Sequence, residues 1–258
     1  MKKNNYMLFI VVRAFILMLS IVTLSCASDQ GSSDYKPNKF SRKKLSEADK
    51  LIYISSTIYF ISDFSQQDLI ACSPLIDVLI KKNKTTNSRI KMCKKIYDKC
   101  LLQGTCLVQM NGQRTMLNYH KKTEGLVQFQ IVNTDVCPYG LGDSSDGQKT
   151  YKVMCLDPFK SVAADLSKYP LGTVIYIADV VGLHLPNGEI HDGYFVVRDS
   201  GGDIDGFGRF DFFTGFVPTG KNNVFSNLGL GGEANFEYKV VTGSEAERVL
   251  NQTRFPGL

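Results

Sequence analysis

Cysteine spacing is the feature that most constrains the fold of this chain. Seven cysteines occur in 258 residues, and one of them, Cys26, follows an amino-terminal apolar stretch. The other six form an even set, which in an oxidising compartment favours three disulfides. The sequence does not choose among the pairings, but four of the six precede residue 107 and two follow residue 136, so two lobes could each close their own bridges. The expected disulfide cysteines are Cys72, Cys93, Cys100, Cys106, Cys137 and Cys155.

A zinc site is the alternative use of these cysteines. The chain has no Cys-x-x-Cys pair, and none of its three histidines stands at ligand spacing to a cysteine. We therefore expect no metal site, and nothing in the sequence indicates another cofactor.

Residues 1–25 predict an export signal, because a basic start precedes an apolar stretch that only Arg13 interrupts. Residues 23–26 read TLSC, which resembles a bacterial lipoprotein cleavage site with Cys26 as the lipidated residue. An ordinary secretory peptide is the alternative. An uncleaved anchor is disfavoured, since Arg13 splits the span below the roughly 20 residues that a membrane helix needs. Residues 26–40 would be a flexible tether, and the protein would be periplasmic, an outer-membrane lipoprotein or secreted.

Net charge argues against nucleic acid as a partner. The formal charge is +5, and it falls to +2 when the basic residues of the leader, Lys2, Lys3 and Arg13, are removed. So small a charge does not fit a nucleic-acid surface.

Two regions of different patterning follow the tether. Over residues 41–105, apolar side chains cluster at helical spacing, notably at 69–80 and 90–100, which predicts an α-helical lobe. Over residues 107–258, short β-branched and aromatic runs alternate with turn signals, which predicts many short strands in a barrel or sandwich. The expected fold class is therefore mainly β with a helical lobe (α+β).

The stretch from Arg198 to Gly215 carries the clearest chemical signal, because acids and glycines alternate there between two expected strands. Three structural readings compete with catalysis: a loose calcium site, turns capped by aspartates, and ion pairs with Arg198 and Arg209. An EF-hand is excluded, since Gly201 and Phe212 stand at its first and twelfth ligand positions. The four carboxylates of the stretch are Asp199, Asp203, Asp205 and Asp211.

This stretch resembles the signature of the three-aspartate (3D) domain family, which includes membrane-bound lytic transglycosylase A. The signature runs Asp-x-Gly-Gly-x-Ile-x-Gly and then Arg-x-Asp-x-Phe. Upstream, residues 157–158 (DP) and 169–177 (YPLGTVIYI) resemble two further segments of the family. The resemblance covers roughly residues 125–215. The positions in register are Asp199, Gly201, Gly202, Ile204, Gly206, Arg209, Asp211 and Phe213.

The resemblance implies a six-stranded double-psi β-barrel over residues 107–258, preceded by the α-helical region, and a peptidoglycan glycan strand as substrate. Asp211 occupies the position of the family's catalytic acid, and Asp199 would be the supporting carboxylate. The substrate-binding candidates are Arg209, Gly201, Gly202, Asp203, Asp205, Asp135 and Tyr176.

The chemistry sets a physical condition on Asp211. A carboxyl group donates a proton near neutral pH only if its pKa is raised. Phe213 shares the Asp211 face of the expected strand and could desolvate the acid, and Asp199 would add like-charge repulsion. Arg209 lies on the same face and would oppose the shift if it paired with Asp211. We therefore expect Arg209 to bind elsewhere or to hold Asp199.

The predicted function is cleavage of peptidoglycan between N-acetylmuramic acid and N-acetylglucosamine by a single Asp general acid and base, as in a lytic transglycosylase. A lysozyme-like muramidase on the same fold is one alternative, since spare carboxylates could activate water. A glycan-binding barrel without activity is the other. The expected partners are peptidoglycan glycan strands and, through a lipid anchor at Cys26, a membrane.

Overall fold

A computed structural model describes residues 50–252 of the chain except 51, 82–86, 144–154 and 233–234. These residues belong to one compact unit, Pro37–Leu258. The expected export signal, the tether and the lipidation site at Cys26 lie outside the described residues. None of the described helices is both long and apolar enough to cross a bilayer.

The first of two six-stranded sheets mixes parallel and antiparallel pairs. Its central strand, β8, runs parallel to β10 and antiparallel to β11, which in turn pairs in parallel with β1. A bridge between Tyr53 and Glu237, just before β1 and β12, links the two ends of the strand order. In that order the strands are β1 (Ser55–Tyr59), β11 (Arg209–Phe213), β8 (Ser161–Ala164), β10 (Tyr194–Asp199), β9 (Val174–Tyr176) and β12 (Lys239–Val241).

Aromatic side chains fill the core beneath this sheet. Phe195 and Phe212 pack with ring centroids 4.8 Å apart, and Phe225 of the short helix α3 (Val224–Leu228) covers both. All three rings are fully buried. Each large buried aromatic contributes about 2–3 kcal/mol of hydrophobic stabilisation, so this cluster holds the strands that carry the acidic stretch.

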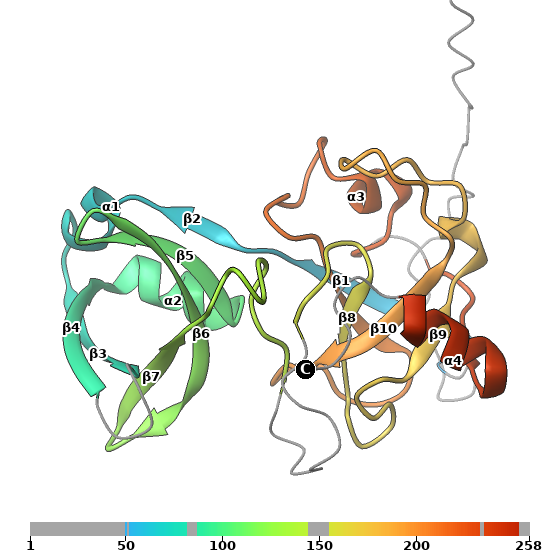
Figure 1. The fold of residues 1–258 in the computed structure, drawn as a ribbon, viewed down its shortest axis with the longest axis horizontal. Coiled ribbons are helices and arrows are strands. Elements are labelled where there is room, and N and C mark those ends of the chain that lie inside the picture. The colour runs from blue at the N-terminus through green and yellow to red at the C-terminus, as the bar shows by residue number, and fades with distance from the viewer. Residues whose placement is uncertain (1–49, 51, 82–86, 144–154, 233–234, 253–258) are drawn as a thin grey trace, which may run out of the picture. The chain divides into compact units, whose positions relative to one another are not determined.

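The second sheet curls around helix α2 (Lys94–Leu102), as Figure 1 shows. Helix α1 (Gln66–Ile70) begins at a capping box between Ser65 and Asp68. The remaining helical segments belong to the part of the chain that forms the first sheet. They are a 3-10 turn, Ala178–Val180, and α4 (Gly243–Gln252). In order across the second sheet, the strands are β2 (Ser62–Phe64), β5 (Thr105–Met110), β6 (Gln113–Thr123), β7 (Leu126–Ile131), β3 (Leu75–Lys81) and β4 (Asn87–Cys93).

The α-helical lobe expected over residues 41–105 is wrong in its described part, because more of it is strand than helix. Short apolar runs fit a helix and a buried strand equally well. In β3, Val78 and Ile80 are buried at a spacing of two residues, which is the period of a strand. The boundary at residue 107 is wrong as well. Strands β5, β6 and β7 belong to the second sheet, while β1 belongs to the first. The expectation of a mainly β chain is confirmed.

Three disulfides form, as the even number of cysteines predicted. Cys72–Cys93 and Cys100–Cys106 fasten the second sheet and its helices. Cys137–Cys155 closes the loop that leads from the second sheet back to the first. The four early and the two late cysteines therefore pair among themselves.

Candidate active site

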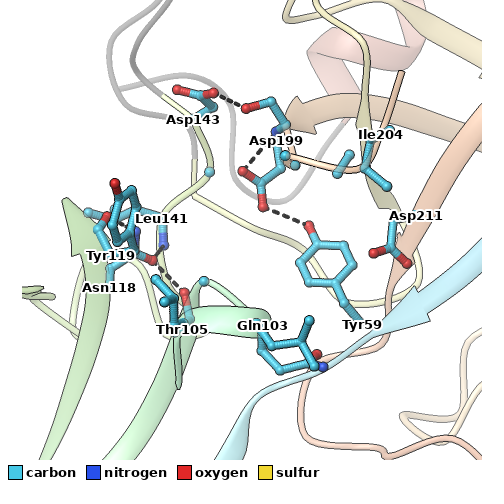
Figure 2. Close-up of a pocket in the computed structure, with 18 of the residues that line it drawn as sticks. Tyr59, Gln103, Thr105, Asn118, Tyr119, Leu141, Asp143, Asp199, Ile204 and Asp211 are labelled. Carbon is cyan, nitrogen blue, oxygen red and sulfur yellow. Dashed lines mark hydrogen bonds between the residues drawn. The ribbon is translucent and has the colours of Figure 1, made fainter. Parts of the chain in front are cut away.

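A cleft of about 510 Å³ is lined by residues of both sheets and holds the two aspartates of the 3D signature (Figure 2). The first sheet contributes Tyr59, Ala163, Asp199 and Asp211. The loop after Asp199 adds Ser200, Gly201, Gly202 and Ile204. The opposite wall comes from the end of α2 and from the second sheet, and it includes Leu102, Gln103, Thr105, Asn118, Tyr119, His120 and Gln130.

Strand register brings the two aspartates to opposite sides of one small residue. Ala163 on β8 pairs with Asp199 on β10 and with Asp211 on β11. The backbones of the two aspartates are thus two strands apart, about 10 Å at the usual strand spacing. A bulge between Val197 and Asp199 interrupts the pairing on β10, a feature that often redirects a side chain beside a site. The alanine methyl leaves space between the two carboxyl groups.

Asp199 is held by two hydrogen bonds. The Ser200 amide donates to Oδ1 at 2.9 Å, and the Tyr59 hydroxyl donates to Oδ2 at 3.1 Å. Burial raises the pKa of Asp199 to about 7. The charges of Asp143 and Asp211 contribute to this rise, while the two hydrogen bonds oppose it. This carboxyl group therefore titrates near neutral pH.

Asp211 has less hydrogen-bond support for its carboxyl group than Asp199 has. Its Oδ1 is buried and has no hydrogen-bond partner among the described residues. Burial raises its pKa, and the Thr57 hydroxyl and the Arg209 guanidinium lower it. Thr57 lies beside Asp211 in the register of β1 and β11. A buried oxygen without a donor favours the protonated carboxyl group, which can donate to a ligand.

Arg209 binds elsewhere, as the sequence analysis expected. Its guanidinium donates to the Phe210 carbonyl at 2.8 Å and to the Thr57 hydroxyl at 3.0 Å. The charge of Arg209 lowers the pKa of Asp211, but burial outweighs it and the net shift is upward. Along β11, Phe210 and Phe212 lie in the aromatic core, whereas Phe213 lies in a separate cluster with Tyr59.

Tyr59 is not among the predicted site residues, because the apolar run at residues 51–61 indicated part of a helical lobe rather than the strand β1. Alternation was the available signal, since Thr57 and Tyr59 stand two residues apart on one face. Tyr59 is only 6% exposed, and its ring packs on Phe213 with centroids 5.0 Å apart. Burial raises its pKa well above the ordinary value, as do the charges of Asp199 and Asp211. Its hydroxyl group is therefore a permanent donor at any physiological pH.

The other predicted site residues divide into two groups. Gly201 and Gly202 line the cleft, and a Cβ on Gly201 would approach Ile204 Cγ1 to 2.7 Å, so a larger residue does not fit. The remaining five lie outside the cleft lining. Among these, Tyr176 packs against Tyr194 and Lys239 instead. Those that the structure does not bring to the cleft are Asp135, Asp203, Asp205, Arg209 and Tyr176.

A tight loop forms one edge of the cleft beside Asp199. The Asp143 amide donates to the Arg198 carbonyl at 3.0 Å, and the Asp143 carboxylate accepts a hydrogen bond from Ser200 Oγ. Only glycine fits at position 142, because a Cβ there would lie 1.8 Å from the Arg198 carbonyl oxygen. The Arg198 side chain in turn donates to the Cys155 carbonyl at 2.6 Å. The Cys137–Cys155 disulfide thereby anchors the loop that supplies Asp143.

The second-sheet wall is mostly polar. The Asn118 side chain is held by hydrogen bonds within the protein. Its Oδ1 accepts one from the Thr105 hydroxyl at 2.5 Å and one from the Leu141 amide at 3.3 Å. Tyr119 is 38% exposed and offers an aromatic face to the cleft. His120 contacts Lys81 at 3.1 Å, and burial together with that charge lowers its pKa. In the part of the chain that the structure describes, no three His, Cys, Asp or Glu side chains gather closely enough to hold a metal ion.

Residues 160–224, which include β8, β10, β11 and the acidic stretch, match the family model of the 3D domain. The chain therefore carries a 3D domain, and the resemblance found in the sequence is confirmed. No curated protein sequence matches the chain.

Several solved structures are similar in fold. A membrane-bound lytic murein transglycosylase from Agrobacterium tumefaciens is 13% identical, with 76% of this chain and 77% of that chain covered and a TM-score of 0.45. MltA from E. coli, solved with bound chitohexaose, is 13% identical over 74% of this chain and 73% of that one, with a TM-score of 0.42. The lytic transglycosylase LtgG of Burkholderia pseudomallei is also 13% identical, over 72% and 70%, with a TM-score of 0.35.

Proposed function

We propose that this protein cleaves peptidoglycan glycan strands between N-acetylmuramic acid and N-acetylglucosamine as a lytic transglycosylase, with Asp211 as the single general acid and base. The observation that carries the proposal is the buried, unpartnered Oδ1 of Asp211 in a polar cleft that it shares with Asp199. The 3D domain supports the substrate class, because that family's signature implies a peptidoglycan substrate. The cleft volume also suits a few sugar units.

In the proposed reaction, Asp211 gives its proton to the glycosidic oxygen as the bond from C1 of the muramic acid breaks. Positive charge develops on the sugar ring, and the ionised Asp199 stabilises it electrostatically. The Asp211 carboxylate then takes the proton of the sugar's own 6-hydroxyl as that oxygen attacks C1. The product carries a 1,6-anhydro ring, and the acid is protonated again without a water molecule.

Hydrogen bonding supports this division of roles. Both oxygens of Asp199 accept a hydrogen bond, from Ser200 and Tyr59, which is the pattern of an ionised carboxylate. Asp211 Oδ1 receives none from the residues that the structure describes, which suits the member that carries the proton. The charge of Asp211 also raises the pKa of Asp199, and the form of the pair with one proton is the one we propose to be active.

We also infer that the first sheet is the double-psi β-barrel that the 3D signature implies. Its six strands and their mixed pairing support this inference. The Tyr53–Glu237 bridge supports it too, because it joins strands from the two ends of the order. In this proposal β1 is a barrel strand, although it precedes the strands of the second sheet in the sequence.

Export and a lipid anchor at Cys26 remain part of the proposal. Three disulfides in one chain favour an oxidising compartment such as the periplasm. Metabolic labelling with a clickable fatty acid tests the anchor. Label that disappears in the Cys26→Ser variant would support lipidation, and label retained in that variant would contradict it.

Murein zymography with the Asp211→Asn variant tests the reaction. We expect clearing by the wild-type protein and at least a 100-fold loss in the variant, with the melting temperature within a few degrees of wild type. Asp98→Asn is the matched control, because Asp98 is an exposed carboxylate paired with Lys94 on α2. Full activity of Asp211→Asn would contradict the assignment of the acid.

Mass spectrometry of the released muropeptides separates the possible reactions. Products that end in 1,6-anhydromuramic acid identify a transglycosylase, and reducing ends identify a hydrolase that uses Asp199 on water. Binding of chito-oligosaccharides without any product would leave a glycan-binding barrel.

A further inference from the structure

Tyr59 stands between the two acids of the cleft. Figure 2 shows its ring between the carboxyl groups of Asp199 and Asp211, with the hydroxyl group directed at Asp199. The ring is fixed on one side by Phe213, which is its register partner on β11. At 6% exposure, the side chain cannot leave this position without opening the cluster around it.

The backbone of Tyr59 is tied to both sheets. Its carbonyl oxygen accepts a hydrogen bond from the Thr214 amide at 3.1 Å, just after β11. The next amide, that of Phe60, donates to Gln103 Oε1 at 2.7 Å on the second-sheet wall. The phenol is therefore held in place from two directions before any ligand binds.

We propose that Tyr59 is a positioning residue for the carboxyl pair, whose phenol hydroxyl orients Asp199 and determines which of the two acids holds the shared proton. The inference rests on the proposed function, which it deepens. Tyr59 touches Asp199 rather than the reacting sugar atoms, so it acts through the carboxyl group.

Charge and donor geometry explain this role. The hydroxyl group satisfies Asp199 Oδ2, while the Ser200 amide satisfies Oδ1, so the ionised form of Asp199 is fully bonded. The charged groups that face this pair are Asp143 from the loop, Arg198 from β10 and Arg209 from β11. Without the hydroxyl group, Oδ2 would be buried without a donor. Asp199 would then compete with Asp211 for the proton.

The test is the Tyr59→Phe variant, which keeps the ring on Phe213 and removes only the hydroxyl group. Carboxyl carbon NMR of protein labelled with ¹³C-aspartate follows the titration of Asp199 directly, with Asp199→Asn identifying its signal. We expect the pKa of Asp199 to rise by about half to one unit, which corresponds to the loss of one hydrogen bond. In zymography and kinetics, we expect kcat to fall about tenfold while KM changes little.

Tyr238→Phe is the matched control. It also removes a buried phenol, which contacts the Tyr169 hydroxyl at 2.5 Å and donates to the Lys50 carbonyl at 3.1 Å, away from the cleft. That variant should leave the Asp199 titration unchanged. An Asp199 titration that is the same in Tyr59→Phe as in wild type would overturn the proposal.

Two further readouts keep the test decisive. If Tyr59→Phe does not fold, 3-fluorotyrosine at position 59 keeps the shape and makes a stronger donor, so the pKa of Asp199 should fall instead of rise. An unchanged value would overturn the inference. The NMR titration needs no activity, so a protein that clears no murein would refute the proposed function while this titration still decides the role of Tyr59.

Discussion

Asp199 and Asp211 compete for one proton, and this determines how activity should depend on pH. Asp199 has a pKa of about 7, and that of Asp211 is also raised. The pair holds two protons at low pH, one at intermediate pH and none well above 7. We expect a bell-shaped dependence of kcat/KM in which activity falls as pH rises through about 7. A muropeptide-release assay between pH 4 and pH 9 measures it, and activity that keeps rising beyond pH 8 would contradict the pairing.

The same shift predicts a stability effect at Asp199. Its folded pKa lies above the ordinary value of an aspartate, so burial of the carboxyl group costs nothing at low pH and destabilises the protein as pH rises toward 7. Asp199→Asn removes that cost and can still bond Ser200 and Tyr59. At pH 8 we expect its melting temperature to exceed that of wild type by roughly 3–6 °C, about 1–2 kcal/mol in a chain of this size. Calorimetry at pH 3, below the ordinary pKa of an aspartate, is the control, where the difference should vanish.

At the scale of elements, the loop that carries Asp143 depends on one close approach. Gly142→Ala would place a methyl group 1.8 Å from the Arg198 carbonyl oxygen, so the loop must move away from β10. We expect a loss of about 2–4 kcal/mol in the free energy of unfolding and a marked loss of activity, since Asp143 would leave Ser200. Thermal melts measure the first effect. Gly202→Ala is the stability control, because no atom lies within 4 Å of its Cβ, and an equal loss there would refute the steric argument.

The elements also show what the sequence could predict. Strands β9, β10 and β11 and the acidic stretch were readable, because glycine punctuation and alternating apolar residues agree there. The register that brings Asp199 and Asp211 to Ala163 was not readable, since no local pattern specifies which strands pair. The short apolar segments of β1 and β3 indicated helices although both are strands. Because of the error at β1, Tyr59 was not predicted as a site residue. These segments form strands because of the strands they pair with in the folded protein, and not because of their local conformational preference.

The whole molecule depends on its disulfides to different degrees. Cys72–Cys93 spans 21 residues, while Cys100–Cys106 spans only 6. The chain-entropy argument gives about 3 kcal/mol for the longer loop and about 2 kcal/mol for the shorter one. We therefore expect the Cys72→Ala/Cys93→Ala variant to melt several degrees below Cys100→Ala/Cys106→Ala. Chemical denaturation of both variants measures the order, and the reverse order would show that strain or residual structure outweighs loop length.

One pairing in the molecule has a consequence for biosynthesis. Thr57 and Arg209 are 152 positions apart in the chain, yet they meet across β1 and β11. A ribosome or a translocation channel releases the amino-terminal side first, so the early strand must wait for its partner. The acid pair is therefore assembled only after Asp211 has emerged, so an incomplete nascent chain lacks the site.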